Sequence, residues 1–347
     1  MTRAFNLRKN SKVLLVAVAA LLPSSLARSE DFYANKTLTI LVGSSVSSGF
    51  ATYSQLIGPY MRKHLPGNPT VVVRAMPGAG GSTAALHVFR IAPKDGTLMA
   101  TLTPNALMDK AFGTRVQVDP VQFGYVGGAQ RAVRICFVSG DAPATTFKDA
   151  QATKLLMGST QVGSLTSDYN NMLMRAAGAK FHTVLGYEGP GALYLSAERG
   201  ETHGACGLEW SAFKSTKSDM LRLGKLKILL QIGAAPVDEL TKLGAPHAWD
   251  VINSADDLAA MKLYVNFQEL LGKAYVTPPD TPPERLADLR KAFEAAIRDP
   301  DLLAQAAKMK LDIDVISGDE IKGAVEALYT AKPETLKRLI DLVAEPK

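Results

Sequence analysis

The chain has 347 residues, of which 47% are apolar and 21% are charged, so it is long enough for two domains and too apolar to be intrinsically disordered. The formal net charge is +6, yet no basic stripe interleaved with aromatic residues runs through the sequence. We therefore expect no nucleic-acid partner.

The N-terminus has the features of a secretory signal peptide. An apolar run at residues 13–22 is followed by Pro23 and the small residues Ser25 and Ala27, and it is preceded by the basic residues Arg3, Arg8, Lys9 and Lys12. We expect residues 1–27 to be cleaved and the mature chain to be exported to the periplasm. The run is too short to span a bilayer, which takes about 20 residues. The leader holds four of the 39 Lys and Arg residues and none of the 33 Asp and Glu residues, so the mature charge is +2.

Short runs rich in Val, Ile and Leu alternate with longer segments of helical periodicity. Strands are predicted over residues 38–43, 70–75, 97–103, 134–139, 154–159, 182–187, 227–233 and 273–278. Helices are predicted over residues 52–64, 82–91, 167–177, 211–221, 256–271, 283–298 and 333–344. This alternation is typical of an α/β fold in which helices cover a parallel sheet on both faces.

Glycine and serine gather in four loops that follow predicted strands, at residues 43–52, 77–83, 158–167 and 186–192. Glycine lets the backbone approach a ligand closely, and the free N–H groups at the start of the following helix favour an anion. Ligands bind beyond the carboxyl ends of strands in open parallel sheets, so these loops would together offer many donors and almost no charge. Each loop taken alone is also explained as a tight connection.

The loop "PGAGGST" at residues 77–83 does not match either nucleotide-binding fingerprint. The Walker pattern needs a Lys after the last Gly, where Ser82 and Thr83 stand, and the dinucleotide pattern needs a third Gly at position 83. No Gly-x-Ser-x-Gly elbow occurs, the five histidines are scattered, and no four residues have metal-ligand spacing. We therefore expect no catalytic residue, no metal and no cofactor.

Two further features leave alternatives open. Cys136 and Cys206 form either one disulfide, in an oxidising compartment, or two buried free thiols. Arg131 and Arg134 stand near the expected crossing between domains, where ion pairing explains them more simply than ligand contact does.

The loops and the segments between them resemble the Bug family, the periplasmic solute-binding receptors of tripartite tricarboxylate transporters. The resemblance runs across essentially the whole mature chain, and its most specific pieces are "PGAGG" at 77–81 and "APKDGT" at 92–97. It implies a two-domain periplasmic-binding-protein type II fold with a ligand cleft between the domains, which closes like a hinged trap. Domain one would comprise residues 31–130 and 227–347, and domain two residues 131–226.

The resemblance also implies a function and a set of site residues. Such a receptor is a non-catalytic monomer that captures a small-molecule carboxylate and delivers it to integral membrane permease subunits. By position, the ligand-binding residues of domain one are Ser44, Ser45, Ser48, Gly49, Phe50, Gly78, Ala79, Gly80 and Gly81. Those of domain two are Ser159, Thr160, Gly163, Ser164, Tyr187, Glu188 and Gly189.

The first loop departs from the family pattern, which usually has a run of glycines followed by an Asp and later an Arg. This chain has Ala51 and Gln55 at those places, so the identity of the ligand stays open. Glu188 is unfavourable opposite an anion, and it either faces solvent or pairs with a cationic group. The alternatives are a sensory binding protein that signals to a membrane kinase, an enzyme that uses the same cleft, and a binder of a neutral or zwitterionic molecule.

Overall fold

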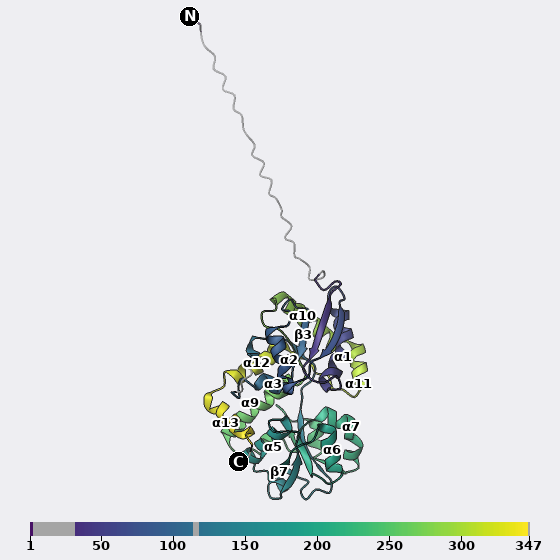
Figure 1. The fold of residues 1–347 in the computed structure, drawn as a ribbon, viewed down its shortest axis with the longest axis vertical. Helices are drawn as coiled ribbons and strands as arrows, with labels where there is room; N and C mark the ends of the chain where they lie inside the picture. The colour runs from purple at the N-terminus through teal and green to yellow at the C-terminus, as the bar shows by residue number, and fades with distance from the viewer. Residues whose placement is uncertain (3–31, 114–117, 346–347) are drawn as a thin grey trace.

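The computed structural model describes residues 1–2, 32–113 and 118–345, which form two lobes built on separate sheets (Figure 1). Except for its first two residues, the predicted signal peptide lies outside the described residues. In the described part, no helix is both long and apolar enough to cross a membrane.

The first sheet has six strands in the order β11-β4-β10-β3-β1-β2. β1 is parallel to β2 and β3, whereas β10 runs antiparallel to β3 and β4, and β11 antiparallel to β4. Their bounds are β1 Thr37–Val42, β2 Thr70–Ala75, β3 Leu98–Thr101, β4 Gly124–Gly128, β10 Ala274–Thr277 and β11 Ile316–Ser317.

Helices cover both faces of this sheet, as the alternation of buried side chains along β1 requires. Leu38 and Ile40 of β1 belong to the cluster formed with α1 and α10, whereas Leu41 belongs to the cluster formed with α2, α9 and α12. The bounds of these helices are α1 Gly49–His64, α2 Ser82–Arg90, α9 Ala255–Leu271, α10 Pro283–Ile297 and α12 Gly318–Tyr329.

The second sheet has five strands in the order β7-β6-β8-β5-β9. β6 is parallel to β7 and β8, and β5 is antiparallel to β8 and β9; the bounds are β5 Arg134–Ser139, β6 Leu155–Gly158, β7 Phe181–Val184, β8 Gly204–Glu209 and β9 Leu226–Ile232. α5 packs against one side of the lobe's core, and α6 and α7 form a separate cluster with β5 and β8. These helices are α5 Leu165–Ala176, α6 Pro190–Glu198 and α7 Trp210–Arg222.

The remaining helices are short or lie at the chain's end. They are α3 Pro104–Met108, α4 Phe147–Ala150, α8 Asp238–Lys242, α11 Pro300–Lys308 and α13 Pro333–Val343. Single turns of 3-10 helix cover Ala79–Gly81, Pro120–Gln122 and Ala248–Asp250.

All eight predicted strands and all seven predicted helices are present, with ends shifted by up to three residues. The prediction missed the two-residue β11 and also β4 and β8, in which glycines weakened the strand pattern. Those glycines are required by packing, since a Cβ on Gly127 would lie 2.8 Å from the Phe293 ring and one on Gly204 would lie 2.0 Å from the Phe137 carbonyl oxygen. The expectation of a purely parallel sheet was wrong, because β5 and β10 run antiparallel to their neighbours.

β9 lies in the second sheet, whereas the predicted division into domains places residues 227–233 with the first. Its pairing with β5 matches Arg134 to Ile232 and Ser139 to Leu226, so the whole strand is hydrogen bonded within the second lobe. A boundary at residue 226 would cut this strand from its sheet. The chain stays with the second lobe beyond β9, since Leu240 and Ala245 belong to the cluster formed by β5, α6 and α7.

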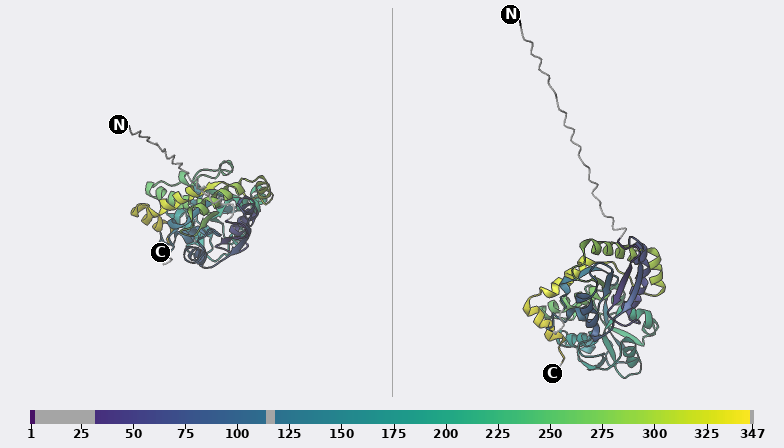
Figure 2. Two further views of the ribbon diagram at one scale, coloured as in Figure 1. Left: turned by 90° about the horizontal axis from the view of Figure 1, so that it is seen from above. Right: turned by 45° about the horizontal axis from the view of Figure 1, so that its top comes forward.

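The two lobes share one hydrophobic cluster along the side where α9 and α13 lie (Figures 1 and 2). The Tyr169 ring of α5 meets the Tyr264 ring of α9 edge to face, with centroids 5.6 Å apart. Arg175 Nη1 donates to the carbonyl oxygens of Leu342 and Ala344 at 3.1 and 2.6 Å. The end of the chain is therefore bound to the second lobe, although α13 follows the elements of the first.

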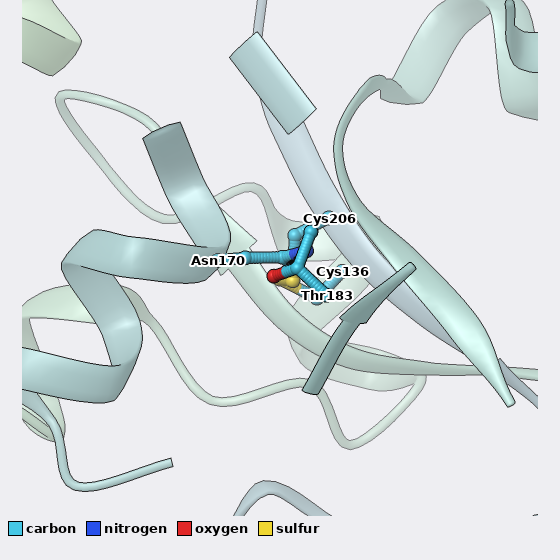
Figure 3. The surroundings of a disulfide bond; sticks show 4 residues. All are labelled: Cys136, Asn170, Thr183 and Cys206. Carbon is cyan, nitrogen blue, oxygen red and sulfur yellow. Dashed lines mark hydrogen bonds between the residues drawn. A yellow bond between two sulfur atoms is a disulfide. The ribbon is translucent and has the colours of Figure 1, made fainter. Parts of the chain in front are cut away.

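A disulfide joins Cys136 of β5 to Cys206 of β8, which are directly opposite in the antiparallel pair with Cα atoms 3.9 Å apart (Figure 3). Both residues are fully buried, and the neighbouring Asn170 Nδ2 donates to Thr183 Oγ1 at 3.3 Å. This settles the alternative left by the sequence, since the chain's two cysteines are bonded to each other.

Reduction should therefore destabilise the mature protein. The bridge joins residues 70 apart in the chain, and the loop-entropy model assigns such a cross-link about 4 kcal/mol of unfolding free energy. The oxidised protein, denatured without reductant, should show no titratable thiol, and the reduced protein should show two and a lower thermal midpoint. Two thiols before reduction would contradict the bridge.

Candidate functional site

The first two glycine- and serine-rich loops lie side by side at the carboxyl ends of β1 and β2. These strands are parallel and in register, and the Met76 N–H donates to the Val42 carbonyl oxygen at 2.8 Å where the strands end. The loops therefore leave the same edge of the first sheet, and each leads to the N-terminus of a helix, α1 or α2.

The second of these loops has an unusual backbone. Gly78, Ala79, Gly80 and Gly81 all have positive φ, at 141°, 45°, 64° and 103°. Gly81 has no room for a side chain, since its Cβ would lie 2.1 Å from Thr103 Oγ1, whereas nothing lies within 4 Å of a Cβ on Gly80. A left-handed alanine is uncommon, and such strain is found mainly where the surrounding structure holds a functional loop in place.

The serines of the first loop bond mostly to one another. Ser48 caps α1, since its Oγ accepts the Ala51 N–H at 3.2 Å, and the same hydroxyl donates to the Ser45 carbonyl oxygen at 2.7 Å. Ser44 Oγ lies 2.7 Å from Ser48 Oγ. These hydroxyls therefore shape the loop, while Gly49 is exposed at the start of the helix.

The two loops of the second lobe also form one unit. β6 and β7 are parallel, and the N–H groups of Gly186 and Tyr187 donate to the carbonyl oxygens of Thr160 and Ser159 at 3.0 and 3.3 Å. Ser164 caps α5 by accepting the Ser167 N–H.

The predicted ligand residues of this unit differ in their accessibility. Ser159 is fully buried, and its hydroxyl lies 2.8 Å from Thr166 Oγ1, so in this structure it supports the loop from within. Gly163 is exposed with φ +70°, and Glu188 is exposed, which is the solvent-facing alternative for that carboxylate. Tyr187 is half-buried, and a Cβ on Gly158 would lie 3.4 Å from its ring.

A three-residue segment after β3 links the loops of the two lobes. Thr103 Oγ1 donates to the Gly80 carbonyl oxygen at 2.6 Å, and Asn105 Nδ2 donates to the Gly163 carbonyl oxygen at 3.1 Å. Gln268 of α9 in turn donates to Asn105 Oδ1 at 2.9 Å. The structure thus brings the second loop of the first lobe close to the first loop of the second lobe.

A cavity of about 250 Å³ opens beside this link. Asn105 and Gly163 line it together with Asp109, Asp168 and Glu345, and three carboxyl groups make it unfavourable for an anion. Tyr264 OH donates to Asp168 Oδ2 at 2.7 Å. Burial raises the pKa of Asp168 to about 7, with the Tyr264 hydrogen bond opposing that rise and Glu345 adding to it.

Three largely buried charged side chains lie near the first loop, at the place where the chain crosses between the two sheets. Lys273 Nζ lies 2.8 Å from Glu209 Oε1, and Arg134 Nη1 lies 3.4 Å from the same oxygen. Burial alone would raise the pKa of Glu209, but Lys273 and Arg134 outweigh it and lower that pKa to about 2. The ion pair between Glu209 and Lys273 joins β8 of the second sheet to the residue that precedes β10 of the first.

The sequence analysis missed four residues that the structure places around the loops: Thr103, Asn105, Glu209 and Lys273. Thr103 is the last residue of the predicted strand 97–103 and Asn105 lies just beyond it, so the rule that ligands bind beyond strand ends could have found them. No local pattern marks Glu209 or Lys273, which lie 64 residues apart in the chain. Among the described residues, no group of three or more His, Cys, Asp or Glu side chains is placed to hold a metal ion.

Comparisons with known proteins agree with this architecture. No protein-family model matches the chain. A UPF0065 protein from the TAR-I ttuE-ttuC' intergenic region of Agrobacterium vitis is 23% identical over 338 residues, which cover 95% of this chain and 91% of that protein.

Solved structures show the fold. A TctC solute-binding protein from Polaromonas has a TM-score of 0.65 at 17% identity, over 86% of this chain and 96% of that one. MatC from Rhodopseudomonas palustris with bound malate has a TM-score of 0.62 at 18% identity, over 89% and 99%. The periplasmic binding protein BugD has a TM-score of 0.63 at 16% identity, over 91% and 100%. The α/β type II fold predicted from the sequence is thus confirmed, and these neighbours are binding proteins rather than enzymes.

The raised pKa of Asp168 predicts a pH dependence of stability. The folded protein keeps a proton that the unfolded chain releases near pH 4, so Asp168 makes folding less favourable as pH rises from about 4 to about 7. Asp168→Asn should gain stability over the wild type across that range, with a slope of at most about 1.4 kcal/mol per pH unit. Denaturant unfolding at several pH values measures this difference. A stability difference between the variant and the wild type that does not change with pH over this range would contradict the assignment.

Proposed function

We propose that this chain, a homologue of the UPF0065 proteins with the fold of the TctC and Bug solute-binding proteins, is an exported receptor. It captures a small organic acid between its two lobes and delivers it to the permease subunits of a tripartite membrane transporter. The proposed ligand-binding residues are those of the four glycine- and serine-rich loops, with Thr103 and Asn105 added by the structure.

One observation carries this proposal: the loops leave the carboxyl ends of two parallel strand pairs, one in each lobe, and the segment from Thr103 to Asn105 bonds to both units. Ligands of open α/β sheets bind at this position. The malate bound by MatC, which has the same fold, supports the choice of a carboxylate as the class of ligand.

The chemistry of the loops suits an anion held by main-chain groups. The loop Gly78–Gly81 leads directly into α2, whose free N–H groups and dipole at the N-terminus favour an anion. The N-termini of α1 and α5 add their helix dipoles. Binding would then depend on hydrogen bonds shielded from water, and a ligand of the wrong shape would leave buried polar groups unpaired.

A thermal-shift screen of the mature protein tests the class of ligand. The screen should contain mono-, di- and tricarboxylates, aromatic acids, amino acids and neutral sugars at fixed pH and ionic strength. A carboxylate at about one hundred times its dissociation constant should stabilise the protein by about 2.7 kcal/mol. A shift produced only by neutral or zwitterionic compounds would reject the carboxylate proposal while leaving the fold intact.

Replacing Gly80 by valine should abolish binding without unfolding the protein. The Cβ has space, but the conformation at φ +64° is strained for a β-branched residue, and the methyl groups would occupy the exposed face of the loop. Gly178→Val is a matched control, because Gly178 has φ +67° and equally open space but lies outside the four loops. The two variants should lose similar stability by thermal unfolding, and only Gly80→Val should lose affinity in calorimetry. Unchanged affinity in Gly80→Val would remove this loop from the site.

A further inference from the structure

The proposed site poses an electrostatic problem, because the sixteen residues predicted from the sequence include one charged side chain, and that is the carboxylate of Glu188. Helix N-termini and N–H groups favour an anion only through partial charges. The first turn of α1 contains no acidic residue and no basic one. A full positive charge near the first loop must therefore come from outside the loops.

Lys273 lies directly behind the first loop. A Cβ placed on Gly49, the first residue of α1, would lie 3.6 Å from Lys273 Cε and 3.9 Å from its Nζ. The Lys273 side chain is only 3% exposed, whereas Gly49 is exposed to solvent. The ammonium group thus lies close to the first residue of α1 but is itself shielded from solvent.

Aromatic rings enclose the ammonium group on the side of the first lobe. Lys273 Nζ lies 4.8 Å from the centre of the Phe50 ring and 5.5 Å from that of Tyr53. Cation–π contacts of this kind stabilise a charge away from water. Phe50 is itself one of the predicted ligand residues, so the cation contacts a residue of the first loop.

The pairing of this lysine leaves the crossing with an excess of positive charge. Glu209 is shared by Lys273 and Arg134, so that two buried cations meet one carboxylate. Among the described residues, no other carboxylate lies within ion-pair distance of either cation. Arg134 Nε is buried without a hydrogen-bond partner. The carboxyl of Glu269 interacts with Arg134 only at longer range, and burial raises its pKa.

We propose that Lys273 is the positioning cation that gives the first loop its preference for an anionic group of the ligand. It acts across Gly49 rather than by direct contact, and Glu209 sets the strength of its field by neutralising part of it. This inference rests on the proposed function, since it names the group that would select the carboxylate. Lys273 would also supply a charge near the first loop, where Ala51 and Gln55 supply none.

The proposal predicts effects of opposite sign for the two members of one ion pair. Lys273→Met removes the charge and should weaken the binding of an acid at least tenfold, whereas Lys273→Arg should bind within about threefold of the wild type. Glu209→Gln removes the opposing carboxylate while keeping a hydrogen-bond acceptor, and it should bind the acid more tightly. A purely structural ion pair would instead lose affinity on replacement of either partner.

Titration calorimetry with malate, succinate and citrate measures these effects in the mature protein. Lys214→Met is the matched control, because Lys214 is also paired, with Glu239 at 3.1 Å, but belongs to α7 and contacts none of the loops. The control should keep wild-type affinity. The Lys273→Met/Glu209→Gln double variant contains no unpaired carboxylate at this place, and circular dichroism and thermal unfolding show whether each variant folds.

Three results would overturn the inference. Wild-type affinity in Lys273→Met would show that the charge does not act on the ligand, and weaker binding in Glu209→Gln would show that the pair has only a structural role. The double variant, in which one charge of each sign is removed, should bind with an affinity between those of the two single variants. If the wild type binds none of the three acids and none of the wider carboxylate panel, the proposed function fails and the inference fails with it. Wild-type binding together with unaffected variants rejects the inference alone.

Discussion

The ion pair between Glu209 and Lys273 constrains both lobes at once. A buried ammonium group is costly unless a carboxylate is within reach, and here the carboxylate comes from the other sheet. Satisfying it fixes the end of β8 against the start of β10, and it places Lys273 behind Gly49. The position of the first loop relative to the second lobe therefore depends on a contact that contains no loop residue.

The glycines of the loops serve two different physical needs. Gly81 and Gly78 have no space for a side chain, because Thr103 and Thr83 occupy the place of their Cβ atoms. Gly80 has ample space and is needed only for its left-handed backbone, which leaves its outer face open. Glycine at positions 78 and 81 allows the loop to pack against Thr83 and Thr103, and glycine at position 80 leaves the outer face of the loop accessible. In the second lobe, Ser159 is likewise buried and supports its loop from within, whereas Gly163 is exposed.

The sequence predicted the elements better than the way in which they join. The strands 70–75 and 134–139 were placed to the residue, because runs of β-branched residues bounded by polar ones are a local signal. β4 and β8 were missed, because their glycines are selected by contacts with Phe293 and with the backbone of β5. The prediction also placed β9 in the wrong lobe, because the residues of a strand do not by themselves determine which strand it pairs with.

By itself the sequence determined the fold class, the loops rich in glycine and serine, and the resemblance that suggests a receptor for a carboxylate. Periodicity, turn chemistry and glycine density are properties of neighbouring residues, so they can be read along the chain. Only the tertiary structure decided that Cys136 bonds to Cys206, that Asn105 reaches Gly163, and that Lys273 stands behind Gly49. Each of these contacts joins residues more than 50 positions apart, and their distance is set by the packing of two sheets rather than by any local preference of the backbone.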